Sequence, residues 1–260
     1  NKISTMAVHN STGSISISIE STIATIEFGH PASNSFPAQL LLELTKALET
    51  LGQHPEVVLL VLKSQGTAAF CAGASFDELL AVTNEAEGKT FFSGFAHLIN
   101  AMRKCPKIIV GRVQGKVVGG GVGIVAACDY VLASQEASIK LSELAIGIGP
   151  FVIEPAVSRK MGTTALAELS LAAGEWKSAA WAQEKGLYAK TFETIEKLDE
   201  AVKVLANQIA SYNPEALAEM KKVLWEGTAH WDTLLVERAA ITGKLVLSEA
   251  TKTALAAFKK

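Results

Sequence analysis

The chain has 260 residues, 49% of them hydrophobic, and a formal net charge of −2. This apolar content is enough for the core of one large domain, or of a domain with an appendage. The balanced charge lacks the basic footprint of a nucleic-acid-binding or membrane-surface protein, and no apolar run reaches the about 18 residues that a membrane-spanning helix needs.

The N-terminal part of the chain is predicted to form a hairpin, a helix and a buried strand. Residues 14–20 alternate strictly between polar and apolar, and residues 23–28 repeat the pattern after a Ser-Thr turn. This is typical of two half-buried strands in a hairpin. A loop over 29–37 precedes an amphipathic helix over 38–51. The short apolar run 57–63 is typical of a buried strand.

Strands and helices alternate through the middle of the chain. Helices are expected over 76–80 and 89–103, joined by a polar, mobile segment over 83–88. Alternation of strands with helices predicts an α/β fold with a largely parallel sheet. The further strands are expected at 107–113, 130–133 and from 139 onward, and the further helices at 152–161, 163–171 and 178–186.

The last part of the sequence reads as helices alone. From residue 197 the β-branched runs disappear, and helical patterns begin at Ser or Asn-Pro and end at Gly. We therefore expect an α/β core over 1–196 and a helical region over 197–260 that covers this core or packs on another subunit. The helices are expected at 198–210, 214–226, 230–242 and 248–258.

The three cysteines, Cys71, Cys105 and Cys128, lie in apolar surroundings without the spacing of metal ligands. An odd number of this kind predicts reduced thiols and no metal site. The first residues are polar and lack the apolar core of a signal peptide. These features lead us to expect a cytoplasmic protein.

A glycine-rich stretch at 119–123 is the most informative segment. Four glycines in five residues favour a tight turn, and the apolar run 122–128 after it reads as a buried helix. Free N–H groups and the positive end of the helix dipole would then point at one place. Such a place favours a phosphate, a carboxylate or an oxyanion that forms during a reaction.

Two other interpretations of these glycines remain open. Residues 121–126 fit the GxGxxA pattern of dinucleotide-binding folds, which keeps an NAD(P) oxidoreductase as an alternative. Against it, the pattern lies in mid-chain, and no acid about 20 residues later lies at a strand end. The glycines are also compatible with a purely structural role.

Two further segments carry chemistry. Residues 70–77 again place small residues after a strand and before a helix, so two such turns could direct two N–H groups at one oxygen, as an oxyanion hole requires. Glu143 lies in an otherwise apolar stretch. Such a carboxylate is either a capping or ion-paired acid or a buried general base with a raised pKa.

Four ordered motifs together resemble those of the crotonase family, the enoyl-CoA hydratases and isomerases, and the likeness covers almost the whole chain. It implies a spiral of ββα and βαβ turns, with C-terminal helices that build a homotrimer or a dimer of trimers. The substrate is then an acyl-CoA thioester, and coenzyme A belongs to the substrate rather than being a cofactor. The motifs are His30–Phe36, Phe70–Phe76, Gly119–Gly123 with Cys128–Asp129, and Ser142–Glu143 with Gly147–Pro150.

The resemblance also implies roles for single positions. Ala74 and Gly120 match the two oxyanion N–H donors for the thioester carbonyl, and Glu143 matches one of the two hydratase glutamates. Backbone positions along the coenzyme A path match Ala32, Ser33, Ala72 and Gly73. The residues considered for the coenzyme A phosphates are Lys116, Lys140, Lys259 and Lys260.

The chain departs from the two-glutamate hydratases at one catalytic position. Gly123 stands where they carry the first glutamate, and Ser75 stands where an aspartate is usual. A single acid fits a Δ3,Δ2-enoyl-CoA isomerase, or single-glutamate hydratases resembling methylglutaconyl-CoA hydratase, to which the motif context is closer. Glu154 could serve as a second acid, although a solvated residue at a helix start is the simpler interpretation. A non-catalytic binder of CoA thioesters is a third alternative.

Overall fold

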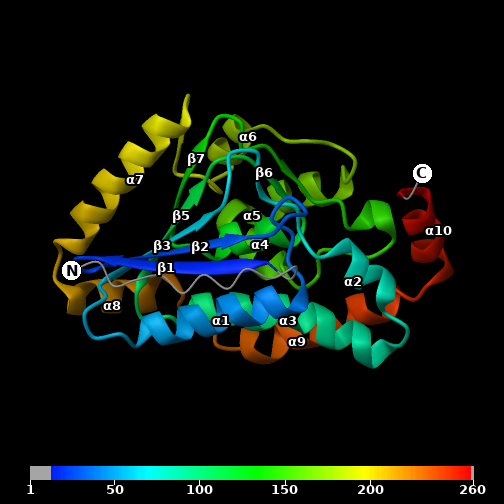
Figure 1. The fold of residues 1–260 in the computed structure, drawn as a ribbon. Coiled ribbons are helices and arrows are strands. Elements are labelled where there is room, and N and C mark those ends of the chain that lie inside the picture. Colours follow the sequence, from blue (N-terminus) through cyan, green and yellow to red (C-terminus); the bar gives the residue numbers. More distant parts are fainter. Residues whose placement is uncertain (1–12, 259–260) are drawn as a thin grey trace.

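The computed structural model describes residues 13–258 of the chain and shows an α/β fold with two sheets (Figure 1). The strand order is β1-β2-β3-β5-β7-β9 in the larger sheet and β4-β6-β8 in the smaller one. The strands are β1 (Ser14–Glu20), β2 (Ile23–Gly29), β3 (Leu59–Ser64), β4 (Ala69–Cys71), β5 (Ile108–Val113), β6 (Lys116–Val118), β7 (Tyr130–Ser134), β8 (Ile139–Lys140) and β9 (Lys190–Phe192).

Ten α-helices and one short 3₁₀ helix, η1, lie among the described residues. They are α1 (Ala38–Gly52), α2 (Phe76–Ala81), α3 (Glu85–Lys104), α4 (Gly120–Ala127), η1 (Leu144–Ile146), α5 (Glu154–Leu171), α6 (Ala179–Glu184), α7 (Ile195–Ala210), α8 (Pro214–Leu224), α9 (Trp231–Leu245) and α10 (Glu249–Phe258). Over residues 13–258, none of these helices combines the length and apolarity needed to cross a membrane.

The larger sheet confirms the predicted hairpin and the predicted parallel sheet. β1 and β2 pair antiparallel, and β2, β3, β5, β7 and β9 pair parallel. β5 is buried along its whole length, as expected for a strand with helices on both sides. β9 was not predicted, because its three residues are too short to show a periodic pattern.

The smaller sheet determines where the motifs meet. Its strands β4, β6 and β8 are parallel, so their carboxyl ends lie at one edge. The segments that follow these strands are 72–74, 119–120 and 141–143. The three motif segments therefore come together at this edge, although they are spread over some seventy residues of sequence.

Two hydrophobic clusters hold the layers together. The larger cluster joins the strands to α1, α3, α4 and α5, and it also includes Trp225, Trp231 and Leu235 of the C-terminal part. The smaller cluster packs α7 on the other face of the larger sheet. The C-terminal helices thus share the main core, and the proposed division at residues 196 and 197 stays a prediction.

Helix α3 begins four residues earlier than predicted, so residues 85–88 are helical rather than part of a connecting segment. Two reciprocal hydrogen bonds between side chains and backbone cap its N-terminus. The Asn84 side chain accepts a hydrogen bond from the Glu87 N–H at 2.9 Å, and the Glu87 carboxylate accepts from the Thr83 N–H at 2.9 Å. This reciprocal arrangement satisfies backbone donors at the helix start and lowers the pKa of Glu87.

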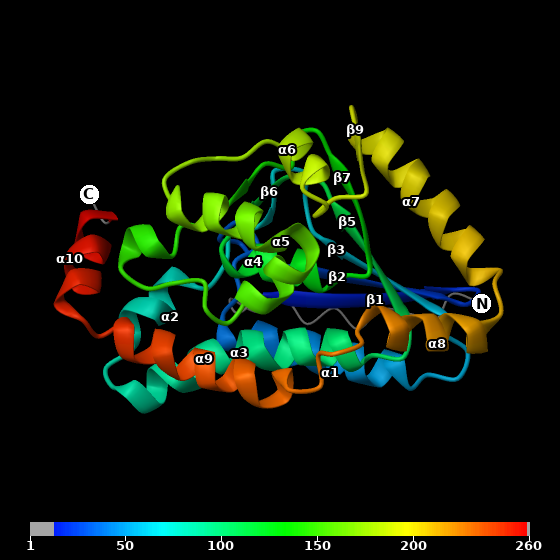
Figure 2. The same cartoon turned by 180° about the vertical axis from the view of Figure 1, so that it is seen from behind.

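Helix α9 lies along α3 (Figure 2), and the two backbones touch at a pair of glycines. A Cβ placed on Gly88 would lie 2.6 Å from the carbonyl oxygen of Gly243. At the other end of the contact, the buried Asn100 side chain donates to the Trp231 carbonyl, and Arg103 pairs with Asp232 at 2.8 Å. The contact therefore fixes α9 closely against α3.

Replacement of Gly88 by alanine is expected to lower the free energy of unfolding by about 1–3 kcal/mol, the usual cost of overpacking. The added methyl group has no space, because the Gly243 backbone occupies it. Gly174→Ala is the matched control, since no atom lies within 4 Å of its added Cβ. Denaturant unfolding measures both variants, and equal midpoints would contradict the close contact.

Candidate active site

The first of the two turns at the edge of the smaller sheet is formed by residues 72–74. The Phe36 N–H donates to the Gly73 carbonyl at 2.8 Å, and the Ser75 N–H donates to the Phe36 carbonyl at 2.9 Å. Gly73 has φ +91°, which favours glycine. The Ala74 N–H lies between these bonds and has no acceptor within residues 13–258.

The second turn is formed by Gly119 and Gly120 at the start of α4. The Gly119 N–H donates to the Lys140 carbonyl at 2.9 Å, and the Gly119 carbonyl accepts from the Val122 N–H. Gly120 opens the helix, and within the described part of the chain its N–H has no acceptor. A Cβ on Gly73 would lie 3.8 Å from the Gly120 nitrogen. The two turns, each with an unpaired N–H group, are therefore neighbours.

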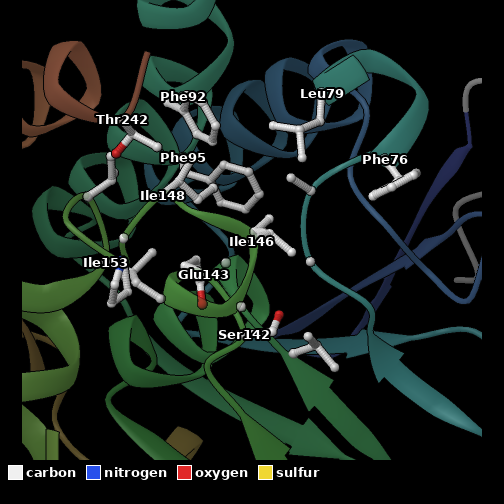
Figure 3. A pocket seen from close by; sticks show the side chains of 18 of the residues that line it. Phe76, Leu79, Phe92, Phe95, Ser142, Glu143, Ile146, Ile148, Ile153 and Thr242 are labelled. Carbon is white, nitrogen blue, oxygen red and sulfur yellow. The ribbon is translucent and has the colours of Figure 1, made fainter. Parts of the chain in front are cut away.

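A cavity of about 190 Å³ adjoins both turns (Figure 3). Helices α2 and α3 contribute apolar side chains to its wall. Glu143 is the only titratable side chain in the lining formed by the described residues, and Ser142 and Thr242 add hydroxyl groups. The lining residues are Ala72, Gly73, Ala74, Phe76, Leu79, Phe92, Phe95, Val118, Gly119, Gly120, Ser142, Glu143, Ile146, Ile148, Gly149, Pro150, Val152, Ile153 and Thr242.

Glu143 is the N-terminal capping residue of η1, and its carboxyl group lies beside the second turn. Its Oε1 would lie 3.0 Å from a Cβ on Gly119, and Gly119 has φ +55°, a conformation that favours glycine. Its Oε2 is buried and has no hydrogen-bond partner among residues 13–258. Burial raises the pKa of this carboxyl from 4.5 to about 7, opposed in part by a hydrogen bond from its own backbone N–H. A carboxyl group of this kind can both accept and donate a proton near neutral pH.

The position of the absent glutamate is filled by a hydrocarbon side chain. A Cβ on Gly123 would lie 2.4 Å from Cγ2 of Ile153, and only 3.5 Å from the Ile153 Cα. Ile153 caps α5, is buried and lines the cavity. Gly123 therefore leaves no space for a side chain, and the cavity has no second acid at this place.

The other predicted positions divide into two groups. Ala72 and Gly73 line the cavity. Ala32 and Ser33 are exposed and lie outside its lining, although the Ser33 carbonyl accepts a hydrogen bond from the Ala72 N–H at 3.1 Å. They brace the first turn, and their contact with coenzyme A stays a prediction.

Three of the charged candidates, Glu154, Lys116 and Lys140, lie outside the cavity lining. Glu154 is ion-paired with Arg238 at 3.3 Å, which gives it a structural partner instead of a place among the lining residues. The ammonium groups of Lys116 and Lys140 lie over the ring of Trp176, at 5.1 and 5.4 Å from its centre. Lys259 and Lys260 fall outside the described residues.

Sequence reasoning missed the distal wall of the cavity. Phe92 and Phe95 come from α3, and Thr242 comes from α9. Figure 3 shows the two rings on the side of the cavity opposite Glu143. Their helical spacing is the same as that of ordinary core residues, so no local signal separates them from the core.

The chain is similar to known proteins in both sequence and fold. A family model described as enoyl-CoA hydratase/isomerase matches residues 18–258. A Bacillus subtilis protein named probable enoyl-CoA hydratase is 26% identical over 94% of this chain and 95% of its own. A peroxisomal Delta(3,5)-Delta(2,4)-dienoyl-CoA isomerase of Arabidopsis thaliana is 28% identical over 74% of this chain and 72% of its own. The crystal structure of an enoyl-CoA hydratase from Bacillus halodurans has the same fold, with a TM-score of 0.87 and 22% identity over 94% of this chain and 99% of that one.

Proposed function

The chain belongs to the enoyl-CoA hydratase/isomerase family, the crotonases, and we propose that it transforms an enoyl-CoA thioester with Glu143 as its acid and base. In this proposal the Ala74 and Gly120 N–H groups bind the thioester carbonyl oxygen. The observation that carries it is a lone carboxyl of raised pKa beside two neighbouring turns, each with a free N–H group.

The chemistry explains why these parts belong together. Removal of a proton next to a thioester is difficult because the negative charge of the enolate must be stabilised. Two fixed N–H donors stabilise that charge where it develops, on the carbonyl oxygen. An acid whose pKa lies near the working pH can remove the proton and return it. The thioester itself supplies the electron sink, so the proposal requires no further cofactor.

The charge of the cavity indicates the kind of acyl group. No Lys, Arg or His side chain lines it among the described residues. A carboxylate on the acyl chain would therefore be buried without a partner, at a cost of several kcal/mol. We propose a hydrocarbon acyl group. This argues against a methylglutaconyl substrate, whose acyl chain ends in a carboxylate.

The place of Ile153 favours isomerisation as a second candidate reaction. In that reaction the Glu143 carboxylate removes the C2 proton of a 3-enoyl thioester, and the electron pair moves onto the carbonyl oxygen. The same carboxyl group then returns the proton to C4. The electron pair on the oxygen re-forms the carbonyl, and the double bond between C3 and C4 is replaced by one between C2 and C3, with no atom gained or lost. Hydration also needs a positioned water molecule. The second acid that would help to hold this water is absent, because residue 123 is glycine and Ile153 fills the space beside it.

A panel of 2-enoyl, 3-enoyl and branched enoyl thioesters of coenzyme A tests the proposal. Hydration adds the mass of water to the product, whereas isomerisation leaves the mass unchanged and moves the double bond. Incubation in D₂O reports proton removal directly, because deuterium enters at the exchanging carbon. Absence of both product and exchange with every thioester would contradict catalysis and leave a non-catalytic binder.

Ligand binding distinguishes the proposed acyl-CoA enzyme from the alternative NAD(P) oxidoreductase. A ligand that binds only the native state raises the melting temperature, and the increase grows with the logarithm of its concentration relative to Kd. We expect acyl-CoA to raise the melting temperature and NAD(P) to leave it unchanged. The reverse result would favour a dinucleotide enzyme.

Replacement of Gly120 by alanine is expected to lower kcat by about 10²- to 10³-fold, the usual effect of losing one oxyanion donor. The added Cβ would lie 2.3 Å from the buried ring of Phe95, so the turn or the ring must shift, and we expect the N–H group to lose its position. Steady-state kinetics on the substrate found in the panel measure the loss. A kcat within twofold of the unchanged enzyme would show that this N–H group has no catalytic role.

We also propose that the molecule assembles as a trimer or a dimer of trimers through its C-terminal helices. Four apolar side chains that are about half exposed or more lie on α7, on α8 or between them, and an interface with another subunit would cover them. Sedimentation measures the assembly directly. The side chains are Val204, Tyr212, Met220 and Val223.

A further inference from the structure

The C-terminal helix α10 contacts the loop that carries Glu143. The side chain of Thr251 is fully buried, and its Oγ1 lies 2.9 Å from the Gly147 carbonyl oxygen. The same hydroxyl lies 2.9 Å from the Leu245 carbonyl oxygen at the end of α9. One hydroxyl group thus joins the end of α9, the first turn of α10 and the loop after η1.

The loop fits this contact at the level of its backbone. Gly147 has φ +82°, and a Cβ placed there would lie 2.6 Å from Thr251 Oγ1 and 2.9 Å from the Thr251 Cα. The helix therefore approaches the loop as closely as the backbone of each allows. Any larger residue at 147 would separate them.

Hydrogen bonds connect the contact to Glu143 itself. The Gly147 N–H donates to the Leu144 carbonyl at 3.2 Å, and the Ile148 N–H donates to the Glu143 carbonyl at 3.1 Å. Residues 143–148 thus form one compact turn, with Thr251 bound near its end. The Glu143 Oε2 has no hydrogen-bond partner in the described chain. The position of the Glu143 carboxyl group therefore depends on the backbone of this turn and on the packing around the side chain.

We propose that Thr251 is a positioning residue, which holds the 143–148 turn against the cavity so that the Glu143 carboxyl group stays buried beside Gly119. The inference rests on the proposed function of Glu143. It gives the C-terminal helices a part in catalysis, since a hydroxyl more than one hundred residues away completes the site.

Charged groups near this loop do not account for the raised pKa of Glu143. On α5 and α9, Glu154 is paired with Arg238, and on α10, Lys252 is paired with Glu249. Lys140 on β8 lies over Trp176. None of these five side chains lines the cavity, so burial is the main influence on the carboxyl group.

Replacement of Thr251 by valine tests the proposal, because valine keeps the shape and removes the hydroxyl. We expect kcat to fall about tenfold with little change in KM, and the pKa of Glu143 to fall from about 7 toward 4.5 as water reaches the carboxyl group. Thr251→Ser keeps the hydroxyl and should retain both values. Thr253→Val makes the same change at an exposed position of α10 and is the matched control.

The pKa is measured by NMR on protein labelled with ¹³C at the glutamate carboxyl carbons, with the Glu143 signal identified by its absence in Glu143→Gln. Should Thr251→Val fail to fold, Thr251→Cys keeps a small side chain with a weaker donor and should give a smaller downward shift. A melting temperature that falls while the Glu143 pKa stays near 7 would overturn the proposal and leave a structural role. The NMR measurement needs no turnover, so it is independent of whether Glu143→Gln proves Glu143 catalytic.

Discussion

Replacement of Glu143 by glutamine is expected to lower kcat by about 10³-fold, within the range that a general acid and base contributes. Glutamine has the same shape but cannot accept or release a proton at neutral pH. Acyl-CoA binding should be nearly unchanged, because the cavity wall and the two N–H groups remain. Steady-state kinetics and α-proton exchange in D₂O measure the loss, and a binding titration measures what remains.

Glu154→Gln is the matched control for this substitution. Glu154 stands eleven residues further along the chain, is paired with Arg238 and does not line the cavity. Its replacement should leave kcat within about twofold, since it breaks only a partly exposed ion pair. Turnover that survives in Glu143→Gln, or that is lost equally in Glu154→Gln, would end the assignment of Glu143.

The raised pKa of Glu143 adds a dependence on pH. Proton removal needs the carboxylate, so the rate should rise as pH increases through about 7. Stability should change in the opposite direction. A folded-state pKa above the unfolded value means that the folded protein holds the proton more tightly, so stability falls as pH rises from about 4.5 through about 7. The Glu143→Gln variant should therefore melt at a higher temperature than the unchanged protein at pH 8, and the difference should vanish near pH 4.

Replacement of Asp129 by alanine is expected to cost about 3–5 kcal/mol of stability, the usual effect of breaking a buried ion pair. Asp129 pairs with Lys221 of α8 at 2.6 Å, and both side chains are almost completely buried. The oxygen that pairs with Lys221, Oδ2, also accepts a hydrogen bond from the Ile109 N–H at 2.8 Å, and Oδ1 accepts one from the Trp225 indole at 2.7 Å. Removal of the carboxylate leaves a buried ammonium group and two N–H groups without partners.

Denaturant unfolding measures this cost, and Asp77→Ala is the control at an exposed position of α2. The control should change stability by less than about 1 kcal/mol. Because the damage comes from the unpaired lysine, Asp129→Asn combined with Lys221→Met should recover part of the loss. A loss below about 1 kcal/mol in Asp129→Ala would show that α8 is held by its packing alone.

Local patterns were enough for much of the fold. Strict alternation over 14–20 and 23–28 predicted the hairpin, because one face of each strand meets the core and the other meets solvent. The same rule failed for β9, which has three residues. It also failed at the start of α3, where Asn84 and Glu87 cap the helix in a stretch without apolar periodicity. Periodicity detects long, amphipathic elements and misses short or capped ones.

The candidate site divides in the same way. Residue types and local patterns predicted the two glycine turns, the single Glu143 and the absence of an acid at residue 123, because these features depend on residue identity and local conformation. The folded chain was needed to show that the two turns adjoin, that Glu143 is buried, and that Ile153 occupies the space beside Gly123. Burial and adjacency depend on segments far apart in the chain, such as Gly147 and Thr251, whose contact no local spacing encodes.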